Sequence, residues 1–153
     1  MINNTREKVL KIYCTFFYAG YVPFGPGTFG TLGAVIPFYF IAGLTPPFYL
    51  ITILFFTAIS IKITNHCIKY YNEEDPGEIV IDEVCGYLFT MFMLPFNWFN
   101  VLSGILIFRI LDIIKPYPVR KAENLRDGYG IILDDVLAGI YSNIIIHLIN
   151  RIL

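Results

Sequence analysis

Charged side chains are missing from two long parts of the chain, residues 12–61 and 84–108, which contain no Asp, Glu, Lys or Arg. Only 15% of the 153 residues are charged, against about a quarter in typical soluble domains, while 56% are hydrophobic. The net charge of −1 argues against nucleic-acid binding and against a polybasic lipid anchor. Uncharged stretches of this length predict helices embedded in a membrane.

Cysteine and histidine are scarce as well. Cys14, Cys67 and Cys85 form an odd, scattered set without a C-x-x-C pair, which argues against a disulfide framework and predicts small buried side chains. His66 and His147 lie far apart in the sequence, which disfavours a zinc site. The chain also lacks the cysteine loop of thiol phosphatases and the G-x-S-x-G of serine hydrolases.

The N-terminal segment superficially resembles a signal peptide. Arg6, Lys8 and Lys11 precede the apolar run 12–20, but no small-residue cleavage pattern follows. We therefore expect a short amphipathic or interfacial helix there.

Five apolar segments with few turn signals and little strand alternation predict helices. They are residues 29–44, 47–63, 84–94, 97–114 and 131–150. The uncharged turns 45–47 and 95–98 join four of them into two hairpins, and Pro37 predicts a kink or an early break in the first. The fold prediction is one all-α domain over residues 1–153, a multipass helical membrane protein with about four to five apolar helices. Several segments are shorter than the ~20 residues of a comfortable span, so a soluble all-α protein remains an alternative.

The distribution of basic residues predicts the orientation in the membrane. Lys and Arg cluster in the N-terminal segment, in 62–69 and in 109–126, whereas the two hairpin turns carry none. Cytoplasmic loops carry the excess of Lys and Arg, so these segments are expected to face the cytoplasm. The acidic residues lie beside the same loops, which predicts an acidic site on the cytoplasmic face.

Eleven of the twelve acidic residues lie between Glu73 and Asp135. In the first group, Asp75-Pro76-Gly77-Glu78 can begin a helix with a capping box. If that helix continues, Asp75, Glu78 and Asp82 share one face, with Glu83 beside them. Carboxylates at this spacing repel one another unless a cation neutralises them. A solvated acidic face is the plain alternative.

The second acidic group lies next to apolar sequence. Asp134 and Asp135 follow Gly-Ile-Ile-Leu, and each unpaired charge would cost ~2.5–3.5 kcal/mol at the centre of a bilayer. We expect the pair to lie near the interface or to be matched by a metal or a basic group. Asp112 ends another apolar run, where an ion pair with Arg109 is the local alternative. A site with only oxygen ligands favours a hard cation such as Mg²⁺.

Two further segments could bind phosphate. Lys115 and Arg120 flank Pro116-Tyr117-Pro118, where they could hold a phosphate or simply determine topology. Residues 25–33 contain G-x-G-x-x-G, but the context excludes a dinucleotide fold and a Walker A loop. Close helix packing, or phosphate contact at a helix N-terminus with the Thr28 hydroxyl, remains possible there.

Four blocks of the sequence together resemble the phosphatidylglycerophosphatase A family. They are GPGT with Gly30 and Gly33, DPGEIVIDEVCG (75–86), FRILDIIKPYPVR (108–120) and DGYGIILDDVLAGI (127–140). The resemblance implies a Mg²⁺-dependent phosphoric monoester hydrolase with several membrane-spanning helices in the bacterial cytoplasmic membrane. Its substrate would be phosphatidylglycerophosphate, hydrolysed to phosphatidylglycerol and phosphate during phospholipid synthesis. A related phosphatase with another phosphorylated substrate stays open, and no oligomeric state is predicted.

The resemblance also implies roles for individual residues. The expected metal ligands are Asp75, Asp82, Glu83, Asp134 and Asp135. The expected catalytic acids are Asp82, Glu83, Asp112, Asp134 and Asp135, and the expected phosphate ligands are Arg109, Lys115, Arg120 and Thr28. Glu78 lies outside the family pattern, so a capping or outer role is expected for it. A small cation or proton transport module is the alternative from another class, and it would need acids distributed across the membrane depth.

Overall fold

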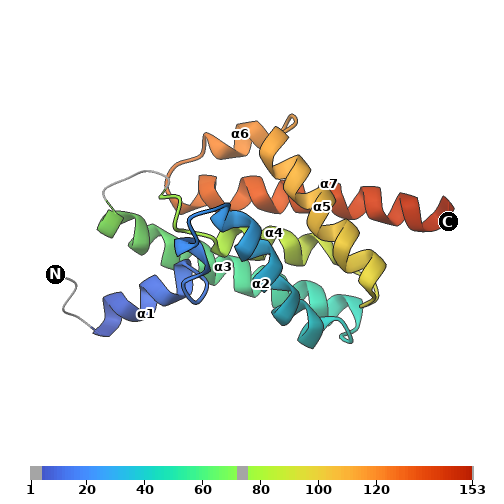
Figure 1. Ribbon diagram of the computed structural model, residues 1–153, viewed down its shortest axis with the longest axis horizontal. Coiled ribbons are helices and arrows are strands. Elements are labelled where there is room, and N and C mark those ends of the chain that lie inside the picture. Colours follow the sequence, from blue (N-terminus) through green and yellow to red (C-terminus); the bar gives the residue numbers. More distant parts are fainter. Residues whose placement is uncertain (1–4, 72–75, 153) are drawn as a thin grey trace.

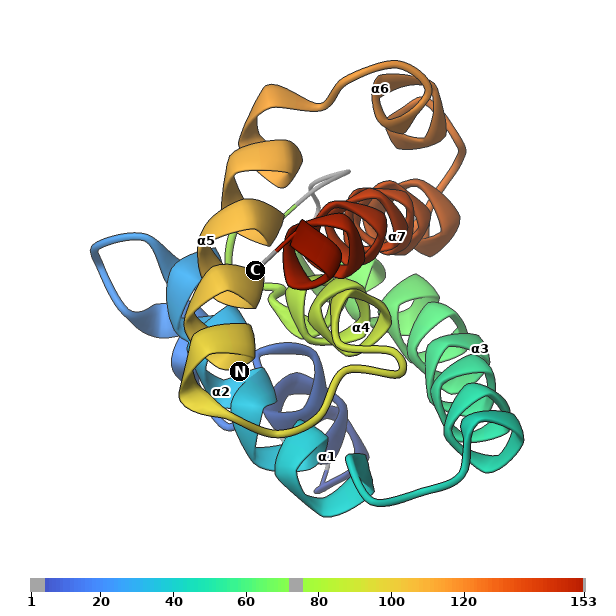
Figure 2. The same ribbon diagram turned by 90° about the vertical axis from the view of Figure 1, so that its right-hand side faces the viewer.

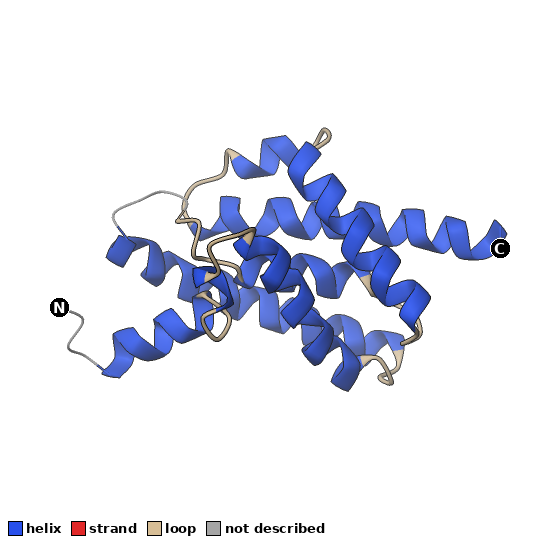
Figure 3. Cartoon of the chain, viewed as in Figure 1, coloured by secondary structure: helices blue, strands red, loops and turns tan. Residues whose placement is uncertain are grey.

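The computed structural model describes residues 5–71 and 76–152, and these residues contain helices and no strand (Figures 1 and 3). In chain order the elements are α1 (Thr5–Cys14), the 3₁₀ turn η1 (Ala19–Tyr21), α2 (Pro26–Ile41), α3 (Pro46–Tyr71), α4 (Ile81–Thr90), α5 (Trp98–Ile114), α6 (Val119–Glu123) and α7 (Gly128–Ile152). The prediction of an all-α fold is confirmed, and so is the short N-terminal helix.

The short helix α4 forms the centre of the molecule. Every residue from Val84 to Thr90 is buried, and α4 packs against α2, α3, α5 and most extensively α7 (Figure 2). Glycines allow the close approach of α4 and α7. A Cβ on Gly86 would lie 2.6 Å from the Asp135 carbonyl oxygen, and a Cβ on Gly139 would meet the Gly86 carbonyl. This contact brings Asp135 next to the first turns of α4.

The far end of α4 is capped by side chains of α7. The Asn143 amide donates to the carbonyls of Thr90 and Phe92, both at 2.8 Å, and the His147 ring contacts the Phe92 carbonyl at 3.2 Å. A helix of ten residues is about 15 Å long, too short to cross a bilayer. Asn143 and His147 therefore satisfy carbonyls that the short helix leaves without intrahelical partners.

Helices α2, α3 and α4 end at other residues than the sequence predicts, and α4 ends at Thr90 where the apolar segment continues to 94. Helix α3 continues to Tyr71, eight residues beyond the predicted end at 63, because residues 62–71 contain neither glycine nor proline. Helix α2 runs past Pro37 to Ile41, so that proline does not end it.

The predicted helix start at Asp75-Pro76 is wrong. Residues 76–80 form a turn in which the Ile79 N–H donates to the Pro76 carbonyl, and α4 begins only at Ile81. The Val80 N–H donates to the Cys14 carbonyl at 3.0 Å, so contact with α1 replaces a helical bond. Glu78 consequently does not share a helix face with Asp82.

The outer faces of four helices carry exposed apolar side chains, in contrast to the buried α4. They include Ile36 and Phe40 of α2, Phe48, Ile51 and Phe55 of α3, Leu102, Leu106 and Ile113 of α5, and Ile144 and Leu148 of α7. Large contiguous apolar surfaces are unusual on soluble monomers. By length and composition two helices, α3 over Pro46–Lys69 and α7 over Gly128–Ile152, could cross a bilayer. These features favour a membrane location.

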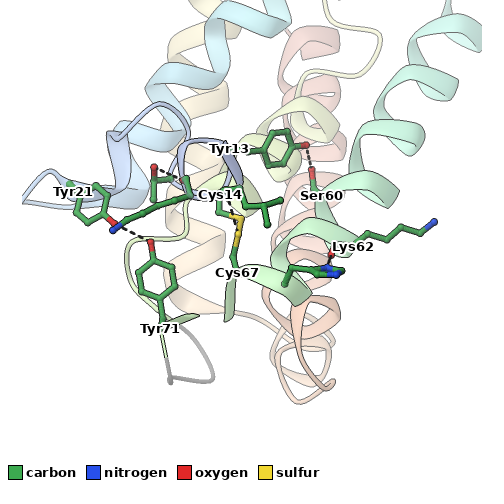
Figure 4. Close-up of a disulfide and its surroundings, with 11 residues drawn as sticks. Tyr13, Cys14, Tyr21, Ser60, Lys62, Cys67 and Tyr71 are labelled. Atoms are coloured by element: carbon green, nitrogen blue, oxygen red, sulfur yellow. Dashed lines mark hydrogen bonds between the residues drawn. A yellow bond between two sulfur atoms is a disulfide. The ribbon is translucent and has the colours of Figure 1, made fainter. Parts of the chain in front are cut away.

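The expectation that the cysteines stay unpaired is wrong for two of them. Cys14 of α1 and Cys67 of α3 form a disulfide (Figure 4). Cys85 is a free buried thiol, as expected. Sequence spacing could not show that α1 packs along the last turns of α3. One hydrogen bond, which the Val80 N–H donates to the Cys14 carbonyl, connects the disulfide-bonded residue to the start of α4.

Reduction of this disulfide should destabilise the protein strongly. The bond closes a loop with a sequence separation of 53, for which chain entropy gives about 4 kcal/mol. Thermal unfolding in detergent should therefore occur at a lower temperature for Cys14→Ser than for Cys85→Ala. Thiol titration of denatured, unreduced protein should find one reactive cysteine, and a result of three would show that the bond is absent.

Candidate active site

A cleft of about 850 Å³ lies where α2, α4 and α7 begin and α3 and α5 end. Its walls include residues of the 76–79 turn and of the connection between α6 and α7. Among the described residues, the charged groups that line it are the acids Asp82, Glu83, Asp112, Glu123, Asp127, Asp134 and Asp135 and the bases Arg109, Lys115 and Arg126. The acids outnumber the bases, so a phosphate dianion could enter this cleft only with additional positive charge.

Three carboxylates meet at one point of the cleft. Asp82 and Glu83 come from the first turn of α4 and Asp135 from α7, and one ligand oxygen of each lies within 4.8 Å of the others. Asp82 Oδ1, Glu83 Oε2 and Asp135 Oδ2 are buried and accept no hydrogen bond. Buried carboxylate oxygens without partners are costly, and a hard divalent cation is the ligand that would satisfy them. The donor set therefore fits Mg²⁺.

The electrostatics of the two α4 acids agree with this fit. Burial raises the pKa of Asp82 well above its usual range, and the charge of Glu83 next to it raises the pKa further. Burial also raises the pKa of Glu83, although contacts with Asp82 and with the Arg109 guanidinium partly offset the shift. Without a bound cation, ionisation of both Asp82 and Glu83 is therefore unfavourable.

Arg109 connects two helices at the edge of these carboxylates. Its Nη1 donates to Asp112 Oδ2 at 2.6 Å on α5 and to Glu83 Oε1 at 3.3 Å on α4. The ion pair with Asp112 is the one that the sequence indicated as an alternative to a catalytic role of Asp112. The contact with Glu83 spans 26 residues, which helical spacing could not predict. The Arg109 Nε is buried and has no partner, so the guanidinium keeps a free donor.

Lys115 is the second cation of the cleft, and two carboxylates hold it. Its Nζ donates to Asp134 Oδ2 at 2.7 Å and to Glu123 Oε1 at 2.9 Å. Partial burial lowers the pKa of Lys115, but the hydrogen bonds to Asp134 and Glu123 outweigh burial and raise it overall. Lys115 ends α5 in a left-handed conformation with φ of 47°, which turns the chain toward α6. Sequence reasoning missed Glu123 because it precedes no apolar run.

The first turn of α2 contacts the acidic cluster directly. Gly25, Pro26 and Gly27 line the cleft, and a Cβ on Gly27 would run into Glu83 Oε1 and lie 2.8 and 2.9 Å from the Arg109 Nη atoms. Gly27 therefore permits α2 to approach α4 and α5 closely. Of the two interpretations of the glycine-rich stretch, the structure supports helix packing, and it directs a helix N-terminus to the cleft as well.

The remaining predicted site residues lie elsewhere. Thr28 and Arg120 are exposed and do not line the cleft, and Glu78 is half-buried beside it. Asp75 lies outside the described residues. The structure adds Arg126 and Asp127, which sequence reasoning did not single out, from the connection between α6 and α7. Seven predicted residues do come together at the cleft: Asp82, Glu83, Arg109, Asp112, Lys115, Asp134 and Asp135.

Comparison with known proteins identifies the family to which the chain is similar. The profile of the phosphatidylglycerophosphatase A family matches residues 12–150. A protein of Bacteroides thetaiotaomicron, provisionally named a phosphatidylinositol-3-phosphatase, is 39% identical over 86% of this chain and 87% of its own length. Proteins named phosphatidylglycerophosphatase A are 38% identical in Escherichia coli, over 88% of this chain and 80% of theirs, and 31% identical in Haemophilus influenzae, over 97% and 96%. No solved structure matches. The chain therefore belongs to the phosphatidylglycerophosphatase A family and is a phosphoric monoester hydrolase.

Proposed function

We propose that the protein is a Mg²⁺-dependent lipid phosphatase that hydrolyses phosphatidylglycerophosphate to phosphatidylglycerol and phosphate. The observation that carries this proposal is the set of unpartnered carboxylate oxygens on Asp82, Glu83 and Asp135, next to the guanidinium of Arg109. The substrate follows the names of the E. coli and H. influenzae relatives.

In this proposal Asp82, Glu83 and Asp135 hold the metal ion. When bound there, Mg²⁺ would neutralise charge on the phosphoryl oxygens and lower the pKa of a coordinated water. Asp134 supports the set from outside, because its Oδ1 accepts the Asp135 N–H at 3.0 Å while Lys115 holds its other oxygen. The predicted metal role of Asp134 thus becomes one of orienting its neighbour.

The phosphate is bound by groups of α2 and α5. The free Nε of Arg109 and its Nη atoms can contact two phosphate oxygens, as guanidinium groups commonly do. The N-terminus of α2, at Pro26 and Gly27, adds the positive end of a helix dipole. Lys115 can exchange its more exposed partner, Glu123, for a substrate oxygen.

The attacking water needs a proton acceptor. Asp112 and Asp134 line the cleft and are each held by one cation, Arg109 and Lys115 respectively. Either carboxylate could orient or deprotonate the water. Arg109 and Lys115 then offset the negative charge that develops on the transferred phosphoryl group.

The activity is tested by phosphate release from the purified protein in detergent. Phosphatidylglycerophosphate should be hydrolysed with Mg²⁺, hydrolysis should stop with EDTA, and it should return when Mg²⁺ is restored. The name of the B. thetaiotaomicron relative favours phosphatidylinositol 3-phosphate as the second candidate. A higher kcat/KM for that lipid would show that it is the preferred substrate, while the proposed Mg²⁺-dependent hydrolysis would stand. No phosphate release from either lipid would refute the proposal.

We place the cleft on the cytoplasmic side of a bacterial membrane crossed by several helices. The support is that Lys and Arg gather in the segments around the cleft, while the turns near Gly43 and Pro95 are uncharged. The two longest helices have 26 and 25 residues, about 38 Å of helix, so their ends can project several ångströms beyond the hydrocarbon core. The carboxylates would then lie at headgroup depth, where water can solvate them.

Labelling of introduced cysteines should show this orientation. Asn124→Cys in the cleft wall should react with an impermeant thiol reagent only from the cytoplasmic side, and Gly43→Cys only from the outside. Both belong on a Cys85→Ala background that keeps the Cys14–Cys67 disulfide. Reaction of Asn124→Cys with the reagent outside sealed cells would show that the topology is the inverse of the proposed one.

A further inference from the structure

An exposed apolar stripe runs along α5 and ends at the cleft. Phe99, Leu102, Leu106, Ile110 and Ile113 recur every three or four residues, so they lie on one face of the helix. All five are exposed, and Ile113 is the most exposed at 72%. Ile113 also lines the cleft. The outer apolar surface and the polar cleft therefore meet at this residue.

The same place is where α5 meets α2. The two helices lie side by side in Figures 1 and 2, and the Arg109 guanidinium packs against Gly27. Pro26 in the first turn of α2 lines the cleft as well. Arg109 and Ile113 are four residues apart on α5, so one face of its last turns carries a phosphate-binding cation and an apolar side chain in succession.

We propose that a phospholipid substrate enters the cleft from the bilayer over Ile113, at the rim that the last turn of α5 and Pro26 of α2 form. Its phosphorylated headgroup reaches Arg109 and the carboxylates, while an acyl chain stays against Leu106, Ile110 and Ile113. This inference rests on the proposed lipid phosphatase activity. The physical reason is that acyl chains are costly to expose to water, so the route must join an apolar surface to the polar site without a break.

The part of the rim between α6 and α7 is the competing route. Leu125 is 49% exposed and lines the cleft too, but its neighbours Asn124, Arg126 and Asp127 are exposed polar or charged residues. A rim of that composition faces water and can release inorganic phosphate. We therefore assign lipid entry to Ile113 and not to Leu125.

Ile113→Asn separates lipid entry from chemistry. The two substrates are phosphatidylglycerophosphate at fixed detergent composition and its deacylated, water-soluble form. The variant should raise KM for the lipid roughly tenfold, leave kcat near the wild-type value, and leave hydrolysis of the deacylated compound unchanged. Ile113→Leu, which keeps an apolar side chain, should have the wild-type KM for the lipid. The matched control is Ile144→Asn, because Ile144 is 52% exposed on α7 away from the cleft lining.

Four results would overturn the proposal. Equal loss on both substrates would show that Ile113 acts on the chemistry or the fold, and an unchanged lipid KM would show that it touches no acyl chain. A lipid-selective loss in Leu125→Asn would move the entry to the other rim. No hydrolysis of either compound by the wild type would refute the proposed function itself, and the entry route with it.

Discussion

Asp82→Asn and Asp135→Asn are each expected to lower kcat about 10³-fold while the protein still folds. Each substitution removes the charge of one of three carboxylates that lie close together, each with a buried oxygen that accepts no hydrogen bond. The lost charge stabilisation on the phosphoryl group is worth several kcal/mol, and each 1.36 kcal/mol corresponds to about a factor of ten. Phosphate release under saturating lipid measures the effect. Glu83→Gln and Asp134→Asn should also lose most activity, since Glu83 belongs to the same set and Asp134 orients it.

Stability distinguishes a lost metal ligand from a damaged fold. In EDTA the three carboxylates are buried close together, so Asp82→Asn should raise the melting temperature above that of wild type by removing repulsion. Added Mg²⁺ should stabilise wild type and do so much less for the variant, because a ligand stabilises only the state that binds it. Glu78→Gln is the control, since Glu78 lies outside the cleft lining and should change activity only mildly. A wild-type melting temperature indifferent to Mg²⁺ would contradict the metal site.

The helices were predictable because long uncharged runs allow few alternatives. Residues 97–114 and 131–150 correspond closely to α5 and α7, since apolar sequence bounded by charge defines where a helix lies. The convergence of Asp82, Arg109 and Asp135 was implied by the family resemblance and by the common side of their segments. The positions of α4 and of its neighbours could not be read in the same way, because they depend on which helices touch.

The errors have a common physical origin in contacts between distant segments. Asp75-Pro76 carries the local signals of a helix start, but the turn at 76–80 instead pairs Val80 with the Cys14 carbonyl. Cys14 and Cys67 pair because α1 packs on α3, and Glu123 reaches Lys115 because the chain turns at the end of α5. Each of these interactions joins residues that no local pattern relates.

Gly27→Ala should lower kcat/KM about 100-fold without unfolding the protein. The new methyl group would collide with Glu83 Oε1 and approach both Arg109 Nη atoms within 3 Å, so both groups must move. A misplacement of about 1 Å at a reacting centre can cost about 10²-fold. Alanine is a better helix former than glycine, so α2 itself should not be weakened.

Gly43→Ala is the matched control for this test, because a Cβ at Gly43 meets nothing within 4 Å. Both variants add one methyl group, and only the one at Gly27 reaches Glu83 and Arg109, the groups proposed to hold metal and phosphate. The Gly27 variant should also need more Mg²⁺ for half-maximal activity, since Glu83, a proposed metal ligand, is displaced. Wild-type kinetics and Mg²⁺ dependence in Gly27→Ala would mean that α2 can retreat freely, and the close approach of α2 to Glu83 and Arg109 would then have no part in catalysis.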